Sequence, residues 1–350
     1  MTLGTIYRDE IAAFTPGDAT VYSKEDLLDL VQGDLDELGR LADEARKGLV
    51  GDNVYYTVNR HIEPTNICRL ACTFCSFAKH DMKTEGSFRY TVDEIIERTK
   101  GDEEEGITEY HIVGGVDAAL NINYYVELIQ ALSREHPTMD IKALSAVEIG
   151  ALAMRHRTTY ADVCARFLEA GASALTGGGA EIFAPRVRNM IAPYKINGEQ
   201  WIEVHEAAHS VGMYTNATIL YGHFETMEER IDHILDIRTL QERTGGFRAF
   251  IPLPFNPQEG TPMENEPEPG GEEFLRTMAL SRLALHNFHT IKAYWPAAGL
   301  DWGTKAIHFG ANDLDGTITE ETIYHTGQSG LTRMQLEDLI RSEGRNPVQR

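Results

Sequence analysis

Short apolar runs alternate with longer stretches of helical periodicity from about residue 54 onward. This alternation predicts parallel strands joined by crossover helices. The expected strands are 54–62, 109–113, 140–144, 173–176, 214–221, 247–253, 290–295 and 304–309. Eight such strands predict an α/β fold, with a TIM-type (β/α)8 barrel as the first choice and a (β/α)6 partial barrel as the alternative.

The two ends of the chain show helical patterns instead. Ser23 and Asp26 form a capping-box pattern ahead of apolar residues at helical spacing, and residues 332–341 form a second helical pattern. We therefore expect a helical extension at 1–50, one barrel domain at 51–315 and a helical C-terminal extension at 316–350.

Composition narrows the class of protein. The 350 residues carry a formal charge of −22, which argues against a nucleic-acid-binding surface. An anionic substrate would then need a local cationic pocket, for which the strand-borne cations Lys142, Arg248, Lys292 and Lys305 are candidates. No apolar run of about 18 residues predicts a membrane span, and the first residues do not resemble a secretory signal.

Three of the four cysteines lie on one short stretch, Cys68-Arg69-Leu70-Ala71-Cys72-Thr73-Phe74-Cys75. Three thiolates can hold three irons of a cubane cluster and leave the fourth iron open for chemistry. A zinc site completed by His61 or His80 is an alternative. A ferredoxin-type electron carrier is another, although it would need a fourth nearby thiolate. Cys164 lies in an apolar helical pattern and is expected to be buried, and thiols that bind iron predict a cytoplasmic protein.

Glycines and polar residues follow several expected strands, where parallel barrels place their chemistry. Gly114-Gly115 follows the second strand and Gly177-Gly178-Gly179 the fourth. We expect these glycines to leave room for a ligand, and Glu181 to accept hydrogen bonds from ribose hydroxyls. Six of the 13 prolines lie between Pro252 and Pro269, and this long segment predicts a lid over the barrel mouth that excludes water.

The cysteine spacing, with Phe74 before the last cysteine, resembles the signature of the radical S-adenosylmethionine (SAM) superfamily. The resemblance implies a [4Fe–4S] cluster on Cys68, Cys72 and Cys75, and SAM bound to its open iron. Reduction of the cluster then cleaves SAM to a 5′-deoxyadenosyl radical. The residues expected to bind the cofactor are Phe74, Gly114, Gly115, Glu181, Asn216 and Thr218. Val116 stands where the superfamily usually has Glu after Gly-Gly, and Glu225 stands at the last position of the strand pattern that lines adenine.

A closer resemblance covers roughly residues 50–315. The stretches that carry it are His61–Cys68, Thr73–Phe77, Gly177–Phe183, Asn216–Thr218 and Lys292–Pro296. Together they resemble the aminofutalosine synthases of the futalosine route to menaquinone. Dehypoxanthine futalosine cyclases and the deazaflavin FO synthase subunit share the cysteine loop and remain alternatives.

The closer resemblance implies a reaction. The adenosyl radical of SAM would add to the enol ether of 3-[(1-carboxyvinyl)oxy]benzoate, and rearrangement, loss of a carboxyl-derived carbon and oxidation would give 6-amino-6-deoxyfutalosine. The implied partners are this aromatic dicarboxylate and an external electron donor such as a flavodoxin or ferredoxin.

Overall fold

A seven-stranded parallel sheet forms the centre of the protein, whose computed structural model describes residues 9–320, 322–323 and 330–350. The strand order is β2-β3-β4-β5-β6-β7-β8, which follows the chain. The strands are β2 (Asn59–Ile62), β3 (Glu109–Ile112), β4 (Asp140–Ala143), β5 (Ala174–Leu175), β6 (Tyr214–Tyr221), β7 (Phe247–Pro254) and β8 (Thr290–Ile291). All of their pairings are parallel, as the strand–helix alternation predicts.

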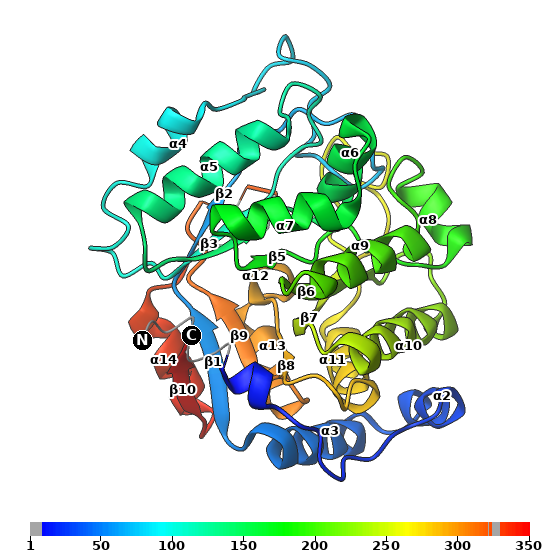
Figure 1. Cartoon of the computed structure of the whole chain (residues 1–350). Helices are drawn as coiled ribbons and strands as arrows, with labels where there is room; N and C mark the ends of the chain where they lie inside the picture. The colour runs from blue at the N-terminus through cyan, green and yellow to red at the C-terminus, as the bar shows by residue number, and fades with distance from the viewer. Residues whose placement is uncertain (1–8, 321, 324–329) are drawn as a thin grey trace.

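The sheet curls into a partial barrel (Figure 1). A second parallel sheet has the order β10-β1-β9, with β1 at Asn53–Thr57, β9 at Asp313–Gly316 and β10 at Asn346–Gln349. Isolated bridges Lys292↔Asp313 and Arg60↔Thr319 connect β9 and the segment after it to the ends of the large sheet. The predicted α/β barrel class is therefore confirmed, in the form of a partial TIM barrel whose open side is covered by β9.

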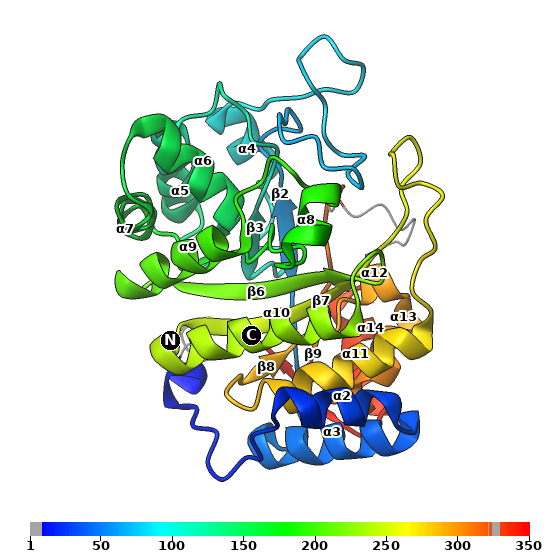
Figure 2. The ribbon, with the colours of Figure 1, turned by 90° about the vertical axis from the view of Figure 1, so that its right-hand side faces the viewer.

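Helices α5, α7, α9, α10 and α11 lie around the outer face of the large sheet, whereas α14 packs against β10 of the small one (Figure 1 and Figure 2). The helices and their bounds are α2 (Lys24–Gln32), α3 (Leu35–Val50), α4 (Val92–Arg98), α5 (Ile122–Glu135), α6 (Ala146–His156), α7 (Tyr160–Ala170), α8 (Pro185–Ile191), α9 (Gly198–Ser210), α10 (Met227–Thr244), α11 (Gly271–Ala284), α12 (Trp295–Ala298), α13 (Leu300–Lys305) and α14 (Arg333–Ser342). No helix in the described ranges is long and apolar enough to cross a bilayer.

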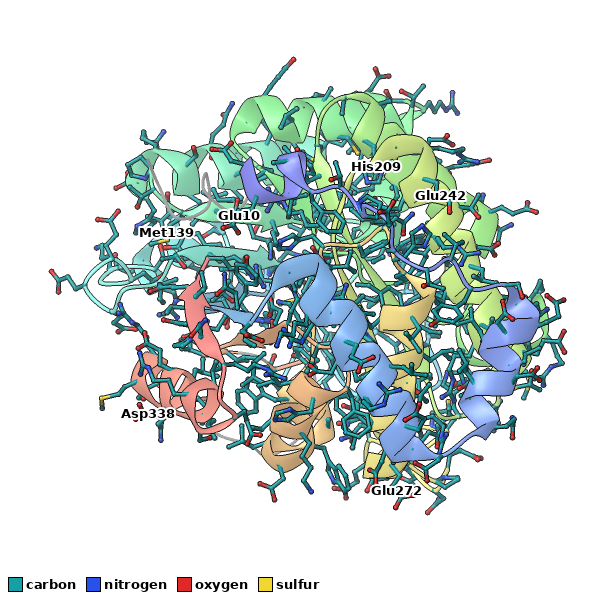
Figure 3. The ribbon with its side chains drawn as sticks, turned by 90° about the horizontal axis from the view of Figure 1, so that it is seen from below. Glu10, Met139, His209, Glu242, Glu272 and Asp338 are labelled. Atoms are coloured by element: carbon teal, nitrogen blue, oxygen red, sulfur yellow. The ribbon has the colours of Figure 1, made fainter. Side chains whose placement is uncertain are left out.

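The acidic side chains of the chain mostly face solvent. Figure 3, which views the molecule from below, shows Glu242, Glu272 and Asp338 at the periphery of the ribbon, and all three are exposed. The net negative charge therefore lies largely on the solvated surface, and the interior does not need to share it.

The prediction of a strand at 304–309 is wrong. These residues finish α13 and continue in a 3-10 turn, Ala306–His308, whose apolar residues Ala306 and Ile307 are buried as helical residues. The eighth strand position belongs to β9, with the sequence Asp-Leu-Asp-Gly. Its acids are too polar to predict a buried strand, and they are accommodated because Lys292 and Arg350 pair with them inside the barrel.

Two other segments also differ from expectation. The strand predicted at 290–295 stops at Ile291, because Trp295 opens the short helix α12 with Pro296 in its first turn. The segment 316–350 contains the expected helix, α14, and also β10, which pairs in parallel with β1.

Arg282 of α11 ties together the strands that complete the barrel. Its buried guanidinium donates hydrogen bonds to the carbonyls of Gly310 (2.9 Å) and Phe288 (2.9 Å) and to Oδ1 of Asn312 (2.8 Å). The same Asn312 oxygen accepts the backbone N–H of Ile291 in β8 at 2.9 Å. One side chain thereby joins α11, β8 and the turn that leads into β9.

We predict that Arg282→Met lowers the free energy of unfolding by about 3 kcal/mol or more, because it leaves buried acceptors without a donor. Chemical denaturation followed by circular dichroism measures the effect. Arg243→Met is the control, since Arg243 pairs with Glu206 on the surface and its loss should cost about 1 kcal/mol or less. Equal stability of the two variants would contradict the role given to Arg282.

Candidate active site

A cavity of about 280 Å³ opens at the carboxyl ends of the central strands. It is lined by all of the residues that the sequence predicts for the cluster and the cofactor. These residues are Cys68, Cys72, Cys75, Phe74, Gly114, Gly115, Glu181, Asn216 and Thr218. The fold thus brings together residues from β6, from the segments that follow β3 and β5, and from the loop that follows β2.

Backbone hydrogen bonds hold the cysteine loop at the rim of this cavity. The N–H of Cys68 donates to the carbonyl of Lys79 at 2.9 Å, and the N–H of Thr73 donates to the carbonyl of Ile191 at the end of α8 at 2.9 Å. Burial raises the pKa of the Cys72 thiol to about 11 and also raises the pKa of Cys75. Both thiols are therefore protonated at neutral pH until a metal displaces the proton.

The donor set fits an iron–sulfur cluster with one open iron. Three thiols from one loop line a single cavity, and thiolates are the usual ligands of cubane irons. Cys164 is fully buried in α7 and does not line the cavity, as its apolar helical pattern predicts.

The glycines after β3 line the cavity and also pack closely against the cysteine loop. A Cβ atom on Gly115 would overlap the carbonyl of Ile67, and one on Gly114 would lie 2.8 Å from the carbonyl of Thr65. The N–H of Gly115 donates to that Thr65 carbonyl at 2.8 Å. Their small size therefore lets the start of the cysteine loop lie directly against the end of β3.

The three glycines after β5 also serve close packing. A Cβ atom on Gly177 would lie 2.5 Å from the carbonyl of Asn216, and one on Gly179 would overlap the side chain of Val147. Only Gly178 has clearance, since its nearest neighbour would be Ser145 Cβ at 3.7 Å. Gly178 and Gly179 line the cavity, whereas Gly177 does not, and close packing is a further reason for glycine at Gly177 and Gly179.

Glu181 forms an ion pair with Lys195, a residue that the sequence analysis missed. Glu181 has a positive φ of 47°, and its carbonyl accepts the N–H of Leu220 in β6 at 2.8 Å. The Lys195 ammonium also lies 5.5 Å above the ring of Phe74. Burial lowers the pKa of Lys195, but Cys72 and Glu181 outweigh this effect and raise the pKa above its usual value. A permanent cation thus lies beside the cysteine loop.

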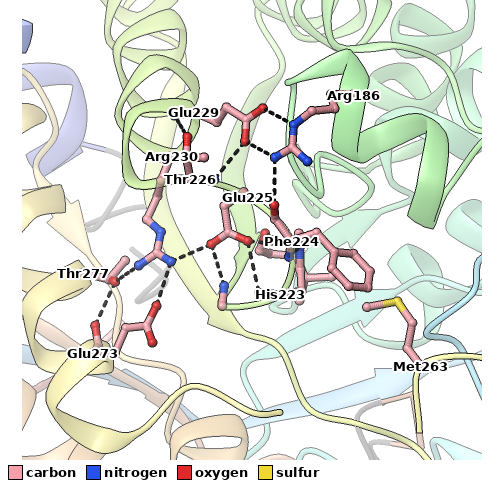
Figure 4. Close-up of polar contacts among 12 residues, drawn as sticks. Arg186, His223, Phe224, Glu225, Thr226, Glu229, Arg230, Met263, Glu273 and Thr277 are labelled. Carbon is pink, nitrogen blue, oxygen red and sulfur yellow. Dashed lines mark hydrogen bonds and ion pairs between the residues drawn. The ribbon is translucent and has the colours of Figure 1, made fainter. Parts of the chain in front are cut away.

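Asn216 and Thr218 both line the cavity, and Thr218 Oγ1 donates to the carbonyl of Gly177 at 2.9 Å. Glu225, farther along the same segment, does not line the cavity. Its carboxylate accepts the N–H groups of Gly222 (2.6 Å) and His223 (3.1 Å) and pairs with Arg230 at 2.5 Å (Figure 4). Glu225 therefore shapes the turn after β6.

The floor of the cavity carries paired charges. Lys142 Nζ lies 2.6 Å from Glu109 Oε2, and Lys292 pairs with Asp315. Burial lowers the pKa of Lys142 to about 8, although Glu109 partly offsets the effect. The other two candidate cations lie elsewhere: Arg248 pairs with Asp140 outside the cavity lining, and Lys305 lies over the ring of Trp302.

Glu148 is a second cavity residue that the sequence analysis missed. It is the third residue of α6, and its Oε2 accepts hydrogen bonds from Ser145 N (2.8 Å) and Ser145 Oγ (2.6 Å) as part of the N-terminal capping box. Its Oε1 accepts the N–H of Gly114 at 3.1 Å. Burial raises the pKa of Glu148 to about 7.

The proline-rich segment predicted as a lid contacts the cysteine loop. The N–H of Met263 donates to the carbonyl of Thr73 at 3.3 Å, and Phe255, Asn256 and Gln258 line the cavity. The turn after β6 packs against the end of the same segment. A Cβ atom on Gly222 would lie only 2.5 Å from the ring of Pro269. This arrangement covers part of the cavity mouth.

Comparison with known proteins agrees with this geometry. Residues 62–237 match the model of the radical SAM superfamily, and residues 244–350 match that of the CofH/MqnC C-terminal region. The chain is 41% identical to the aminodeoxyfutalosine synthase of Thermus thermophilus, over 94% of this chain and 90% of the relative. It is 38% identical to the 5-amino-6-(D-ribitylamino)uracil–L-tyrosine 4-hydroxyphenyl transferase 2 of Methanosarcina barkeri, over 99% and 91% of the two chains.

Solved structures share the fold. Methylornithine synthase matches 98% of this chain and 97% of its own with a TM-score of 0.76 at 19% identity. The hydrogenase maturase HydG matches 98% of this chain and 78% of its own, also with a TM-score of 0.76, at 14% identity. With its cysteine loop, its cavity and its two family matches, the chain belongs to the radical SAM superfamily and, within it, to the family of enzymes with a CofH/MqnC C-terminal region.

Proposed function

We propose that this enzyme is an aminodeoxyfutalosine synthase, which joins the adenosyl group of SAM to 3-[(1-carboxyvinyl)oxy]benzoate and gives 6-amino-6-deoxyfutalosine for menaquinone biosynthesis. The observation that carries the proposal is the 41% identity to the synthase of Thermus thermophilus over 94% of the chain. A second synthase, from Streptomyces coelicolor, is 36% identical over 94% of the chain.

The second candidate is the transfer of the 4-hydroxyphenyl group of tyrosine to 5-amino-6-(D-ribitylamino)uracil. The 38% identity to the Methanosarcina barkeri transferase over 99% of the chain favours it. The two candidates differ in the charge of the aromatic substrate, because the benzoate derivative carries two carboxylates and tyrosine is a zwitterion.

In this proposal the cluster on Cys68, Cys72 and Cys75 supplies, with SAM, the one-electron chemistry. The chain's own residues bind and orient the substrates. Lys142 and Lys292 on the cavity floor are the cations available to the substrate carboxylates, each held by an acid until substrate binds. The segment over the mouth excludes water, and a closed geometry supplies much of the rate in such bond formation.

The electron donor is proposed to be a small acidic carrier such as a flavodoxin or ferredoxin. Arg69, Lys79 and Lys83 follow one another on the cysteine loop and its continuation, and their side chains make no ion pair with the residues that the structure describes. The stretch 69–85 also carries Asp81 and Glu85, so its charge is +1 in a chain of charge −22, and this less acidic stretch favours the approach of an acidic partner near the cluster.

We predict that alanine replacements of Cys68, Cys72 and Cys75 each abolish the cluster, because every thiolate holds one iron. Iron and sulfide analysis after anaerobic reconstitution measures the loss. Cys164→Ala is the matched control and should retain a full cluster. Loss of iron in the Cys164 variant, with retention in any of the other three, would contradict the assignment.

We predict that Glu181→Gln weakens the binding of SAM about tenfold to a hundredfold, because one charge-assisted hydrogen bond to the ribose is lost. Equilibrium dialysis with cluster-loaded enzyme measures it. The analogue 5′-methylthioadenosine contains the same ribose and should lose a similar factor. Unchanged affinity for both ligands would mean that Glu181 serves only to hold Lys195.

The proposed reaction predicts the fate of the adenosyl group. Reduced enzyme is incubated with adenine-labelled SAM and 3-[(1-carboxyvinyl)oxy]benzoate, and in parallel with tyrosine and 5-amino-6-(D-ribitylamino)uracil. The label should appear in an aryl-containing nucleoside, with methionine released alongside.

Mass analysis of the products distinguishes the candidates. Label found only in free 5′-deoxyadenosine with the first substrate, together with an adduct of the uracil that carries the 4-hydroxyphenyl group in the second reaction, would reject the synthase and support the transferase. Enzyme with Cys72→Ala is the control for reactions that do not depend on the cluster.

A further inference from the structure

We propose that Glu148 is the residue that binds the α-ammonium group of SAM. This inference rests on the proposed use of SAM and names a residue for one end of that ligand. It is argued from the hydrogen bonds of Glu148, from the pairing of the other acids in the cavity, and from the position of Gly114.

Three of the acceptor sites of the Glu148 carboxylate are occupied. A carboxylate offers about four lone-pair sites. Ser145 fills two on Oε2, through its N–H and its hydroxyl, and the N–H of Gly114 fills one on Oε1. The carboxylate lines the cavity and is fixed by these three donors, so it has one acceptor site left for a ligand.

Glu148 also differs in charge balance from the other acids of the cavity. Glu109 pairs with Lys142, Glu181 with Lys195, and Asp315 with Lys292. Glu148 is buried, with only 4% of it exposed, yet it has no ion pair with any residue in the described ranges. A buried carboxylate without a cation is costly, and a ligand ammonium would remove that cost.

The position of Glu148 relative to the cysteine loop agrees with this use. Gly114, whose N–H it binds, abuts the carbonyl of Thr65, three residues before Cys68. Glu148 thus lies beside the start of the loop whose thiols would hold the cluster. Val116, which follows Gly115 and also lines the cavity, is apolar, so the carboxylate beside Gly114 is that of Glu148 from α6.

The electrostatic surroundings of Glu148 are simple. Burial raises its pKa to about 7, while hydrogen bonds from Ser145 and Gly114 and the charge of Lys195 act in the opposite direction. Burial, together with the charge of Glu148, raises the pKa of Tyr125 on α5 well above its usual value, so this phenol is neutral. Ionisation of Glu148 between pH 6 and pH 8 should therefore strengthen the binding of an ammonium ligand.

The test compares Glu148→Gln with the parent enzyme after cluster reconstitution, in the absence of any aromatic substrate. Equilibrium dialysis gives the affinities for SAM and for 5′-methylthioadenosine, which lacks the amino-acid end. The affinity for SAM should fall about tenfold to a hundredfold, whereas the affinity for 5′-methylthioadenosine should not change. The rise of SAM affinity from pH 6 to pH 8 should disappear.

Glu94→Gln is the matched control. Glu94 closes the same kind of capping box on α4, where it accepts from Thr91 N (2.7 Å) and Thr91 Oγ1 (2.8 Å), but it is exposed and lies outside the cavity. Its replacement should leave both affinities unchanged. Ser145→Ala keeps the Glu148 carboxylate but removes a donor that orients it, and should give a smaller loss for SAM alone.

Two results would overturn the proposal. One is an unchanged SAM affinity in a Glu148→Gln enzyme with full iron content. The other is an equal loss for SAM and 5′-methylthioadenosine, which would indicate a general distortion. Because no aromatic substrate is present, failure of the synthase assignment does not affect either result.

Discussion

The close contact between the end of β3 and the start of the cysteine loop determines the rest of the site. Gly115 and Gly114 lie so near the carbonyls of Ile67 and Thr65 that side chains at either position would push the loop outward. The hydrogen bond from Gly115 N to the Thr65 carbonyl fixes the register of this contact. The three thiols share one cavity because the loop is held against the end of β3 by this contact. Because Glu148 binds the N–H of Gly114, α6 is coupled to the same contact.

Charge is organised differently inside and outside the protein. The surface carries the excess of acids, whereas the cavity floor contains lysine–acid pairs such as Lys142–Glu109 and Lys292–Asp315. A dicarboxylate must compete with Glu109 and Asp315 for these lysines, so its binding costs part of two existing ion pairs. A zwitterion could use both members of a pair without separating them. If substrate carboxylates bind these lysines as proposed, the choice between the two related activities depends on how readily these pairs open.

Much of the fold could be predicted because strand–helix alternation is a local signal that repeats. β3 to β7 lie where their apolar runs predict, and the cysteine loop lines the cavity at the strand ends. The single strand expected at 54–62 is wrong, because this run is divided between β1 and β2, which belong to different sheets. The eighth strand could not be predicted in the same way. β9 is an acidic segment, and it becomes a strand only because Lys292 and Arg350, distant in sequence, neutralise its carboxylates. Long-range pairing there outweighs local propensity.

The residues that the sequence analysis missed show why the site is harder to predict than the fold. Lys195 lies between α8 and α9 with no periodic pattern around it, and its importance appears only when folding brings it to Glu181 and Phe74. Glu148 did have a signal, since Ser145-Ala146-Val147-Glu148 is a capping-box sequence. The capping-box pattern predicts the hydrogen bonds of one Glu148 carboxylate oxygen, Oε2, but not those of Oε1. The second oxygen binds Gly114, at the end of a strand 34 residues away in sequence. A capping acid at a strand's carboxyl end should therefore be examined for a second role whenever the helix it caps begins at the rim of a cavity.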